Sequence, residues 1–473
     1  MTTSRWVLAL TSAAAFMVAL DQLVVATALT TMQRDLHASL ATLEWTVNAY
    51  SLTFAVLLMT GAALGDRLGR RRILVAGLGL FTASSALCAL APSVGWLIAA
   101  RTLQGAGAAL VMPVTMAMLT STYPIAQRGR ALGIFTGLTG LAVVFGPVIG
   151  GAVTEGLAWQ WIFWLNVPIG LAVMPLVLTR TLESRGPKRR LDLGGVVLVT
   201  GAAFGLVWGL IRGNTAGWAS PEVLCALVGG VVLLGLFVGW ELRVAAPMLP
   251  MRFFAARAFA AGNASSFLLF ATVTSSVFFM SQFLQVGLGN SPLAAGVRMM
   301  PWTAAVLVVA PLSGRLADRV GPRWPLAVGL LCQALGLGWI ALAVHAHRGY
   351  VAVAAGLIVA GCGVTMAMPA AQSAIFGSVP TSAVGQASGT FNTLRQLAGV
   401  FGIATLAAIF TAHGSYASAV TFRAGFIAAI AVAAGISLLG ALIGLSVPSR
   451  ARPATMLMET AQVTTPVGAH AQV

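Results

Sequence analysis

Fourteen apolar runs, each long enough to cross a bilayer, follow one another along this chain of 473 residues. A transmembrane helix needs about 20 predominantly apolar residues. Only 8% of the residues are charged, whereas a soluble domain carries about 25%. We therefore predict an all-α polytopic membrane protein with 14 transmembrane helices. The composition excludes a cytosolic enzyme, and it excludes a disordered chain because disorder requires low hydrophobicity.

The distribution of basic residues predicts how the chain is oriented. The formal net charge is +16, and Lys188 is the only lysine among 27 basic residues. If the N-terminus is cytoplasmic, 20 of the 27 fall in cytoplasmic loops, five lie on the other side, and Arg101 and Arg395 lie inside spans. This asymmetry follows the positive-inside rule. We therefore expect both termini in the cytoplasm, the lipid bilayer as a partner, and no nucleic-acid partner.

Absent motifs narrow the chemistry further. The four cysteines lie in apolar runs without CxxC spacing, which gives no sign of a disulfide frame or a metal site. The single lysine is followed by Arg189, so the chain has no Walker A sequence for ATP. We therefore expect no metal and no cofactor.

An internal repeat divides the chain into related halves. Residues 105–146 and 361–402 share 14 identities over 42 positions without a gap, many of them Gly or Pro. An even number of spans separates the copies, so the repeat is parallel, as in rocking transporters. The predicted parts are an N-terminal six-helix bundle (1–180), two inserted transmembrane helices with their loops (181–257), a C-terminal six-helix bundle (258–447) and a disordered cytoplasmic tail (448–473).

Asp21 is the most deeply placed acid of the chain. It lies about 22 Å into the first apolar run, Trp6–Thr31, at 1.5 Å per residue. An intramembrane carboxylate is costly unless it is paired, protonated or hydrated, so we expect Asp21 to bind and release protons. Arg101 lies at a similar depth and does not deprotonate, so we expect it to tune that equilibrium. The alternative for both residues is a structural role in joining helices.

Further polar residues inside or beside the spans are candidates for a substrate cavity. The candidates are Asn48, Gln104, Met112, Asn392, Arg395 and Glu44. For Asn48 and Gln104, hydrogen bonding between helices is an equal alternative. Glu44 lies at the outer end of its span, where a solvated acid is the alternative. Arg395 is expected to line the cavity or to help close the cytoplasmic gate, with packing as the alternative.

One span, Ala131–Thr154, is rich in glycine and contains a proline. The residues that we select there are Gly133, Gly146, Pro147, Gly150 and Gly151. Small residues let helices approach closely, and Pro loosens the backbone hydrogen-bond ladder. We therefore expect this helix to pack tightly and to bend during a conformational cycle, with static close packing as the alternative.

Several segments resemble motifs of the major facilitator superfamily. Gly61–Arg72 is similar to its signature loop, and Gly314–Arg323 is similar to the degenerate second copy of that loop. Arg101–Gly107 resembles the fourth-helix motif, whose Arg is linked to proton coupling. Gly133–Gly151 resembles the antiporter motif of the family's exporters. This resemblance implies a conformational-switch loop whose residues are Gly65, Asp66, Arg67, Gly69, Arg70 and Arg71. Lipid anchoring by these arginines is the alternative.

Two other segments resemble the 14-helix drug:proton antiporter subfamily. They are Leu20-Asp21 with Ala28-Leu29, and Trp159–Gly170. The sequence departs from the subfamily pattern at four positions: Ala142 replaces a glycine, Thr30 a proline, Ala26 an asparagine, and Asn48 an acid of several multidrug members. The last departure weakens an expectation of broad specificity for divalent cationic drugs.

The residues and the resemblance together imply a proton-coupled secondary active exporter of amphipathic drugs or antibiotics that works by alternating access. It would reside in the bacterial plasma membrane, take protons and a small amphipathic molecule as partners, and act as a monomer. Export of a dedicated metabolite or lipid is the first alternative. A non-transporting membrane sensor or scaffold and an ion channel are alternatives from other classes.

Overall fold

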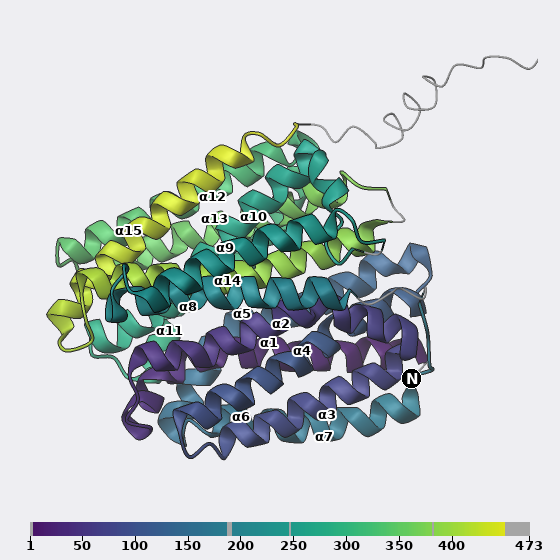
Figure 1. Ribbon diagram of the computed structural model, residues 1–473, viewed down its shortest axis with the longest axis horizontal. Coiled ribbons are helices and arrows are strands. Elements are labelled where there is room, and N and C mark those ends of the chain that lie inside the picture. Colours follow the sequence, from purple (N-terminus) through teal and green to yellow (C-terminus); the bar gives the residue numbers. More distant parts are fainter. Residues whose placement is uncertain (1–2, 187–191, 246, 381–382, 450–473) are drawn as a thin grey trace, which may run out of the picture.

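The computed structural model describes residues 3–186, 192–245, 247–380 and 383–449, and these ranges contain helices and no strand (Figure 1). From residue 450 onward, the expected tail lies outside the described residues. The helices of the N-terminal half are α1 (Thr3–Asp35), α2 (Leu40–Leu68), α3 (Arg70–Ala89), α4 (Val94–Thr122), α5 (Ile125–Gly156), α6 (Trp161–Trp164) and α7 (Asn166–Arg180). The inserted helices are α8 (Leu193–Ala216) and α9 (Pro221–Glu241), followed by the 3-10 helix η1 (Met251–Ala255). The C-terminal half contains α10 (Arg257–Gln282), the π-helical turn η2 (Phe283–Gly287), α11 (Pro292–Val320), α12 (Arg323–His345), α13 (Tyr350–Phe376), α14 (Val384–His413) and α15 (Ala419–Gly444).

Apolar length explains most of these elements. Within the described residues, 13 helical segments are long and apolar enough to cross a membrane. The 29-residue helix α11 occupies the remaining expected span. The prediction of an all-α membrane protein with two six-helix halves and two inserted helices is therefore confirmed. Most side chains of Gly314–Arg323, the expected second copy of the signature loop, lie outside the described residues.

The sixth span differs from the single helix expected over residues 161–178. The structure divides it into the short α6 and the longer α7, with a break at Leu165. Pro168 explains the break, because it has no N–H to donate to the carbonyl of Trp164 and its ring clashes with that carbonyl. The break places Asn166 at the first position of α7, in the interior of the bundle.

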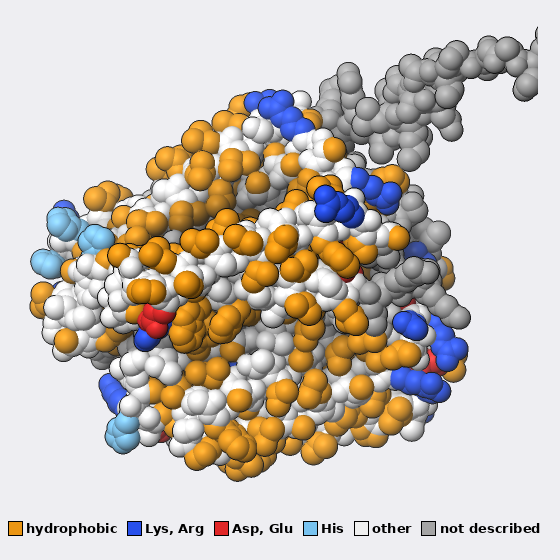
Figure 2. All heavy atoms as spheres, viewed as in Figure 1, with side chains coloured by type: hydrophobic (Ala, Val, Ile, Leu, Met, Phe, Trp, Pro, Cys, Tyr) orange, Lys and Arg blue, Asp and Glu red, His pale blue; other side chains and the backbone are white. Residues whose placement is uncertain are grey.

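The two halves lie side by side, with the inserted helices across their junction (Figure 1). Helix α8 packs against α2 of the first half and α14 of the second, and α9 packs against α8. Both ends of the described chain lie at one end of the bundle, which we call the terminal end; the opposite end is the distal end (Figure 1). Hydrophobic side chains cover the middle of the visible face, whereas Lys and Arg gather mainly at the terminal end (Figure 2).

The distal end is closed by direct backbone contact between α5 and α11. A Cβ atom added to Gly151 would overlap the carbonyl of Pro292, and one added to Gly296 would overlap the carbonyl of Pro147. These two approaches are reciprocal, because each helix supplies one glycine and one backbone carbonyl. Only residues without a side chain permit such a close crossing of the halves.

Helix α1 joins the two halves through polar contacts near the same end. Thr30 Oγ1 donates a hydrogen bond of 2.5 Å to Gln285 Oε1, and Gln285 Nε2 donates one of 3.1 Å to the carbonyl of Thr27. Ser281 Oγ donates to the carbonyl of Ala26 at 3.3 Å. The C-terminal half is therefore attached to successive turns of α1.

Candidate functional site

Asp21 is buried in the N-terminal half and accepts hydrogen bonds from three side chains. Arg101 Nη1 donates to Oδ2 at 2.6 Å, in an ion pair whose two side chains are at most 1% exposed. Gln104 Nε2 donates to Oδ1 at 2.9 Å, and Asn166 Nδ2 donates to the same oxygen at 2.8 Å. Because every partner is a donor, this arrangement suits an ionised carboxylate.

Arg101 is held in place by more than the acid. Its Nε donates to the carbonyl of Thr46 at 3.1 Å, and Nη1 also donates to Gln104 Oε1 at 2.8 Å. The guanidinium carbon lies 4.1 Å from the centroid of the Tyr50 ring, a cation–π contact worth about 2 kcal/mol when desolvated. The cation thus keeps partners on α2 and α4 if its bond to Asp21 is broken.

The site includes residues that the sequence did not single out. Asn166 donates a second hydrogen bond, of 3.0 Å, to Ser85 Oγ, and Ser85 Oγ donates to the carbonyl of Phe163 at 2.9 Å. The network therefore reaches α3 and the break between α6 and α7. The available signal was Asn166 itself, a polar residue inside an apolar run and two positions before Pro168.

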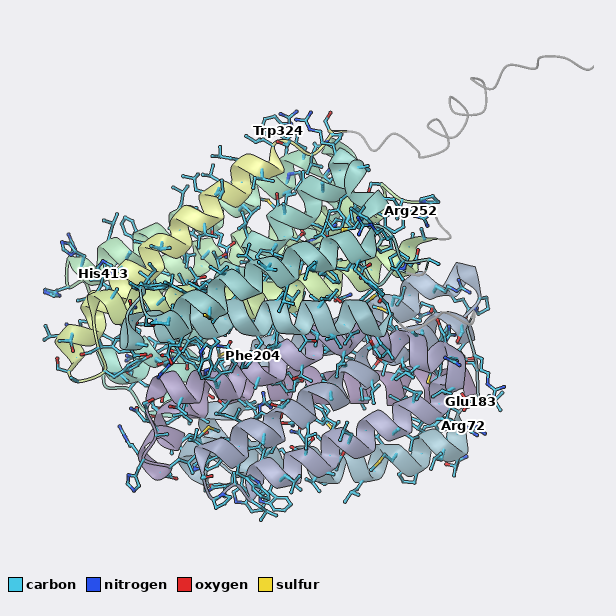
Figure 3. All side chains as sticks on the ribbon, in the orientation of Figure 1. Arg72, Glu183, Phe204, Arg252, Trp324 and His413 are labelled. Atoms are coloured by element: carbon cyan, nitrogen blue, oxygen red, sulfur yellow. The ribbon has the colours of Figure 1, made fainter. Side chains whose placement is uncertain are left out.

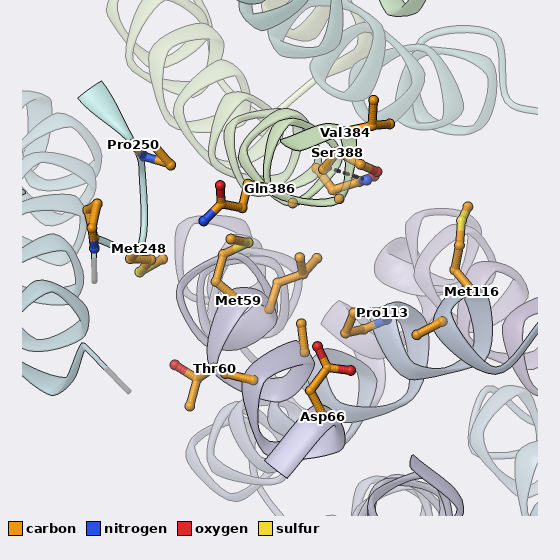
Figure 4. Close-up of a pocket in the computed structure, with 18 of the residues that line it drawn as sticks. Met59, Thr60, Asp66, Pro113, Met116, Met248, Pro250, Val384, Gln386 and Ser388 are labelled. Atoms are coloured by element: carbon orange, nitrogen blue, oxygen red, sulfur yellow. Dashed lines mark hydrogen bonds between the residues drawn. The ribbon is translucent and has the colours of Figure 1, made fainter. Parts of the chain in front are cut away.

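A cavity of about 1480 Å³ opens between the halves at the terminal end (Figure 4). Its wall comes from α2, α4, α5, α14, the first turn of α8 and the segment 241–255. Met59, Met248 and Gln386 point into the space from the two halves and the inserted region (Figure 4). The methionines that line it are Met59, Met112, Met116, Met248 and Met251. Methionine adapts to ligands of different shape, so the wall suits apolar bodies of varied form.

Three of the six residues expected to line a cavity do so: Met112, Asn392 and Arg395. Gln104 is instead bound to Asp21 and Arg101. Two further acids, which were not expected from the sequence, line the wall. They are Asp192, just before α8, and Glu241, at the end of α9.

Asn48 and Glu44 lie outside the cavity lining in this conformation. Both are buried on α2 toward the distal end, with Asn48 fully buried and Glu44 3% exposed. Neither polar atom of the Asn48 side chain has a hydrogen-bond partner among the residues that the structure describes. In the loop after α14, burial and the nearby Glu44 carboxyl raise the pKa of the Tyr416 hydroxyl well above its usual range. Glu44 therefore neither lines the cavity, as expected, nor is solvated, as the alternative had it, but is enclosed where the two halves meet.

The loop between α2 and α3 is held by carboxylates of the same half. Arg70 Nη2 forms an ion pair of 2.7 Å with Asp66 Oδ1, and the backbone N–H of Gly186 donates to the Asp66 carbonyl at 3.1 Å. The backbone N–H of Arg71 donates to Glu183 Oε1 at 2.9 Å. Glu183 lies beside Arg72 at the terminal end (Figure 3). The loop thus binds the segment after α7.

The other selected residues of this loop are Gly65, Arg67 and Gly69. A Cβ at Gly65 would lie 2.6 Å from Cγ2 of Val114, so this glycine lets α2 approach α4 closely. The Arg67 side chain is exposed. Gly69 has a φ of 117°, a backbone conformation that side chains disfavour.

We expect Gly69→Ala to lower the free energy of unfolding by about 1–3 kcal/mol because of this backbone strain. The new Cβ would also lie 2.7 Å from Cδ of Glu183 and displace that carboxylate from Arg71. Thermal unfolding of the purified protein, followed by tryptophan fluorescence, measures the effect. Gly217→Ala is the control, since Gly217 has a φ of 89° with no atom within 4 Å. Equal destabilisation by both would contradict a role for Glu183.

The glycines of α5 differ in their surroundings. A Cβ at Gly146 would lie 2.8 Å from Cβ of Leu23, and one at Gly150 would overlap Thr27, so both positions pack against α1. Gly133 has no atom within 4 Å of such a Cβ. The close packing is therefore confined to the distal half of the helix.

A hydrogen bond between the halves lies beside the Asp21 network. Gln22 Nε2, on α1, donates to Gln396 Oε1, on α14, at 3.1 Å. Gln22 follows Asp21 directly, and Gln396 follows Arg395 in the cavity wall. Helix α1 thus carries the buried Asp21 and, at the next residue, a hydrogen bond to Gln396 of the cavity wall.

Two bundled halves, a central cavity open at one end and a buried Asp21–Arg101 pair in the bundle interior are the features of a membrane transporter. A model of the Major Facilitator Superfamily matches residues 11–403. The chain therefore belongs to the major facilitator superfamily, as the motifs predicted.

Curated relatives cover most of the chain. The tetracenomycin C resistance and export protein of Streptomyces glaucescens is 35% identical over 82% of this chain and 73% of its own. The multidrug efflux pump LfrA of Mycolicibacterium smegmatis is 34% identical over 97% and 91%. The cephamycin export protein CmcT of Amycolatopsis lactamdurans is 37% identical over 85% and 84%.

Solved structures agree with the fold. A POT family transporter in complex with 5-aminolevulinic acid has a TM-score of 0.70 over 97% of this chain and 96% of that chain. A peptide transporter POT in complex with sulfate also has a TM-score of 0.70, over 93% and 94%. Both are 15% identical to this chain, so the similarity concerns the fold.

Proposed function

We propose that this protein is a proton-coupled exporter of amphipathic drugs or antibiotics that works by alternating access. The observation that carries the proposal is the buried Asp21–Arg101 pair, placed beside a methionine-lined cavity that is open at one end. The names of the relatives support the substrate class, because they include export proteins for tetracenomycin C and cephamycin and a multidrug efflux pump.

The proposal includes an orientation of the protein in the membrane. Arginines concentrate at the terminal end, which favours the cytoplasm for both termini under the positive-inside rule. The cavity then faces the cytoplasm, and the structure corresponds to the inward-open state. The protein works in the bacterial plasma membrane as a monomer, with protons and one small molecule as partners and no cofactor.

The proposed transport cycle is derived from the partners that Asp21 and Arg101 have in this state. Substrate enters the cavity from the cytoplasm while Asp21 is ionised and bound to Arg101. When the distal end opens, Asp21 takes a proton from outside, and its bond to the guanidinium weakens. Arg101 keeps Thr46, Gln104 and Tyr50 as partners, so the cation is not left unsatisfied. Substrate leaves outward, and return to the inward state releases the proton to the cytoplasm.

Transport in inverted membrane vesicles tests this proposal. An interior-acid gradient is imposed without ATP, and uptake of a panel of fluorescent drugs is followed against vesicles from an empty-vector strain. We expect gradient-dependent uptake of several amphipathic compounds, and we expect a protonophore to abolish it. Uptake that does not depend on the gradient would contradict proton coupling. If vesicles that contain the protein and hold the gradient take up none of the drugs, the substrate class is contradicted.

A further inference from the structure

The charged side chains of the cavity wall differ in whether they have a hydrogen-bond or ion-pair partner within the protein. Four guanidinium and three carboxyl groups line it. Asp66 and Arg70 neutralise each other at 2.7 Å. Asp192 Oδ1 accepts from the backbone N–H of Gly195 at 2.8 Å, and Glu241 Oε2 accepts from a backbone N–H at 3.0 Å. Each acid in the wall thus has at least one donor within the protein, whereas Glu241 Oε1 has none among the described residues.

Two of the remaining arginines are satisfied or solvated. Arg128 Nε donates to the carbonyl of Tyr123 at 3.0 Å. Arg252 is exposed at the terminal end, and its guanidinium carbon lies 5.4 Å from the Phe253 ring centroid (Figure 3). Neither group needs a ligand to complete its surroundings.

Arg395 is different. Within the described part of the chain it forms no ion pair and donates no hydrogen bond to another residue. Its guanidinium carbon lies 5.0 Å from the centroid of the Phe270 ring. A cation–π contact covers one face of the guanidinium and leaves its N–H donors, which lie in the plane of the group, free for an acceptor. Arg395 lines the cavity, so those donors are available to a molecule inside it.

The depth of Arg395 strengthens such a contact. It lies eleven residues after Val384, the first residue of α14, which corresponds to about 16 Å along the helix. The residues of α14 that line the cavity end at Gln396, so Arg395 is at the inner end of the space. A hydrogen bond to a charged group is stronger here than at the mouth, because the surroundings are less polar.

We propose that Arg395 is an anion subsite and that the preferred substrates are amphipathic anions: aromatic molecules that carry a carboxylate, phenolate or sulfonate. The guanidinium binds the acidic group, and the methionine side chains of the wall contact the apolar body. This inference rests on the proposed export function, and it names the chemical class of the cargo.

Binding to the purified full-length protein in detergent tests the subsite apart from transport. The probes are anthracene-2-carboxylate, its neutral amide and the corresponding aminomethyl cation, whose fluorescence is titrated with protein. We expect the wild type to bind the carboxylate at least about 10-fold more tightly than the amide. Arg395→Gln should weaken carboxylate binding about 10- to 100-fold, as expected for a lost charged hydrogen bond, and change amide binding less than about threefold.

Two further variants keep the test decisive. Arg395→Lys retains the charge without the planar fork, so it should recover part of the carboxylate affinity. Arg243→Gln removes an exposed arginine that lies outside the cavity lining and should leave carboxylate binding within about threefold. The proposal is overturned if Arg395→Gln weakens the amide and the carboxylate equally, if it weakens neither, or if the wild type prefers the cation. Should the vesicles transport no drug, the export function fails, while the binding ratio still decides the anion subsite.

Discussion

Replacing Asp21 by Asn is expected to reduce gradient-driven efflux to the level of vesicles without the protein. Asparagine has nearly the same shape, but it cannot take up a proton. Its Nδ2 group would also meet donors from Arg101, Gln104 or Asn166 where a carboxylate oxygen now accepts. Removing the negative partner of a buried ion pair lowers the free energy of unfolding by about 3–5 kcal/mol. Here the remaining partners of Arg101 reduce that cost, so we expect a folded protein.

Two assays separate lost coupling from lost binding. In proteoliposomes, Asp21→Asn should fail to accumulate substrate against an imposed proton gradient, yet it should still exchange labelled for unlabelled substrate. Glu222→Gln is the matched control, because Glu222 pairs with Arg212 at an exposed position where an ion pair contributes little. Gradient-driven accumulation by Asp21→Asn at the wild-type rate would refute Asp21 as the coupling site.

Valine at Gly151 or at Gly296 should hold the distal end open. Either side chain would overlap a backbone carbonyl of the opposite half, and a backbone cannot give way as a flexible side chain can. Overpacking costs about 1–3 kcal/mol, which shifts a two-state equilibrium about 5- to 150-fold. The observed state, in which the distal ends are in contact, is destabilised by this amount, whereas a state with separated distal ends is not. Both variants should therefore lose transport.

Distances between spin labels measure this shift. Leu90 and Val351 are exposed at the distal ends of the two halves, at 64% and 82%, and labels there should move apart in both variants. Gly133→Val is the control on the same helix, since no atom lies within 4 Å of a Cβ at Gly133. If the labels stay at the wild-type distance in Gly151→Val, the contact of α5 with α11 is not the distal closure.

The sequence predicted the fold well because the bilayer permits few solutions. Apolar length determined the spans, and the internal repeat indicated two halves. The break after α6 was missed, although Pro168 and Asn166 both mark it, because averaging hydropathy over a whole run conceals a local loss of hydrogen bonding. The sequence also could not predict that α8 packs against both halves while α9 packs against α8, since neither helix has a counterpart in the repeat.

The buried ion pair and part of the cavity lining (Met112, Asn392 and Arg395) were predictable from the sequence. Asp21 and Arg101 stand out because charge is rare inside spans, and the structure brings them together. Asn48, Gln104 and Glu44 were expected in the cavity lining but lie outside it, because the side of a nearly uniform apolar helix that faces a cavity depends on the neighbouring helices. Asn166 and Ser85 join the network through tertiary packing across about 80 residues of sequence.

The partners of Asp21 have a consequence for how such proteins diversify. In the described part of the chain, the hydrogen-bond donors to its carboxylate all belong to the first six-span half, whereas Arg395 belongs to the second. Under the roles proposed above, the proton-coupling residues and the anion subsite are therefore encoded in separate stretches of the gene, and the two are joined beside Asp21 by the Gln22–Gln396 hydrogen bond. On this proposal, substitutions in the second half can change which acidic group is accepted while the Asp21 network of the first half stays unchanged. A chimera of two relatives that exchanged halves, kept proton-driven transport and adopted the donor's cargo would show this separation directly.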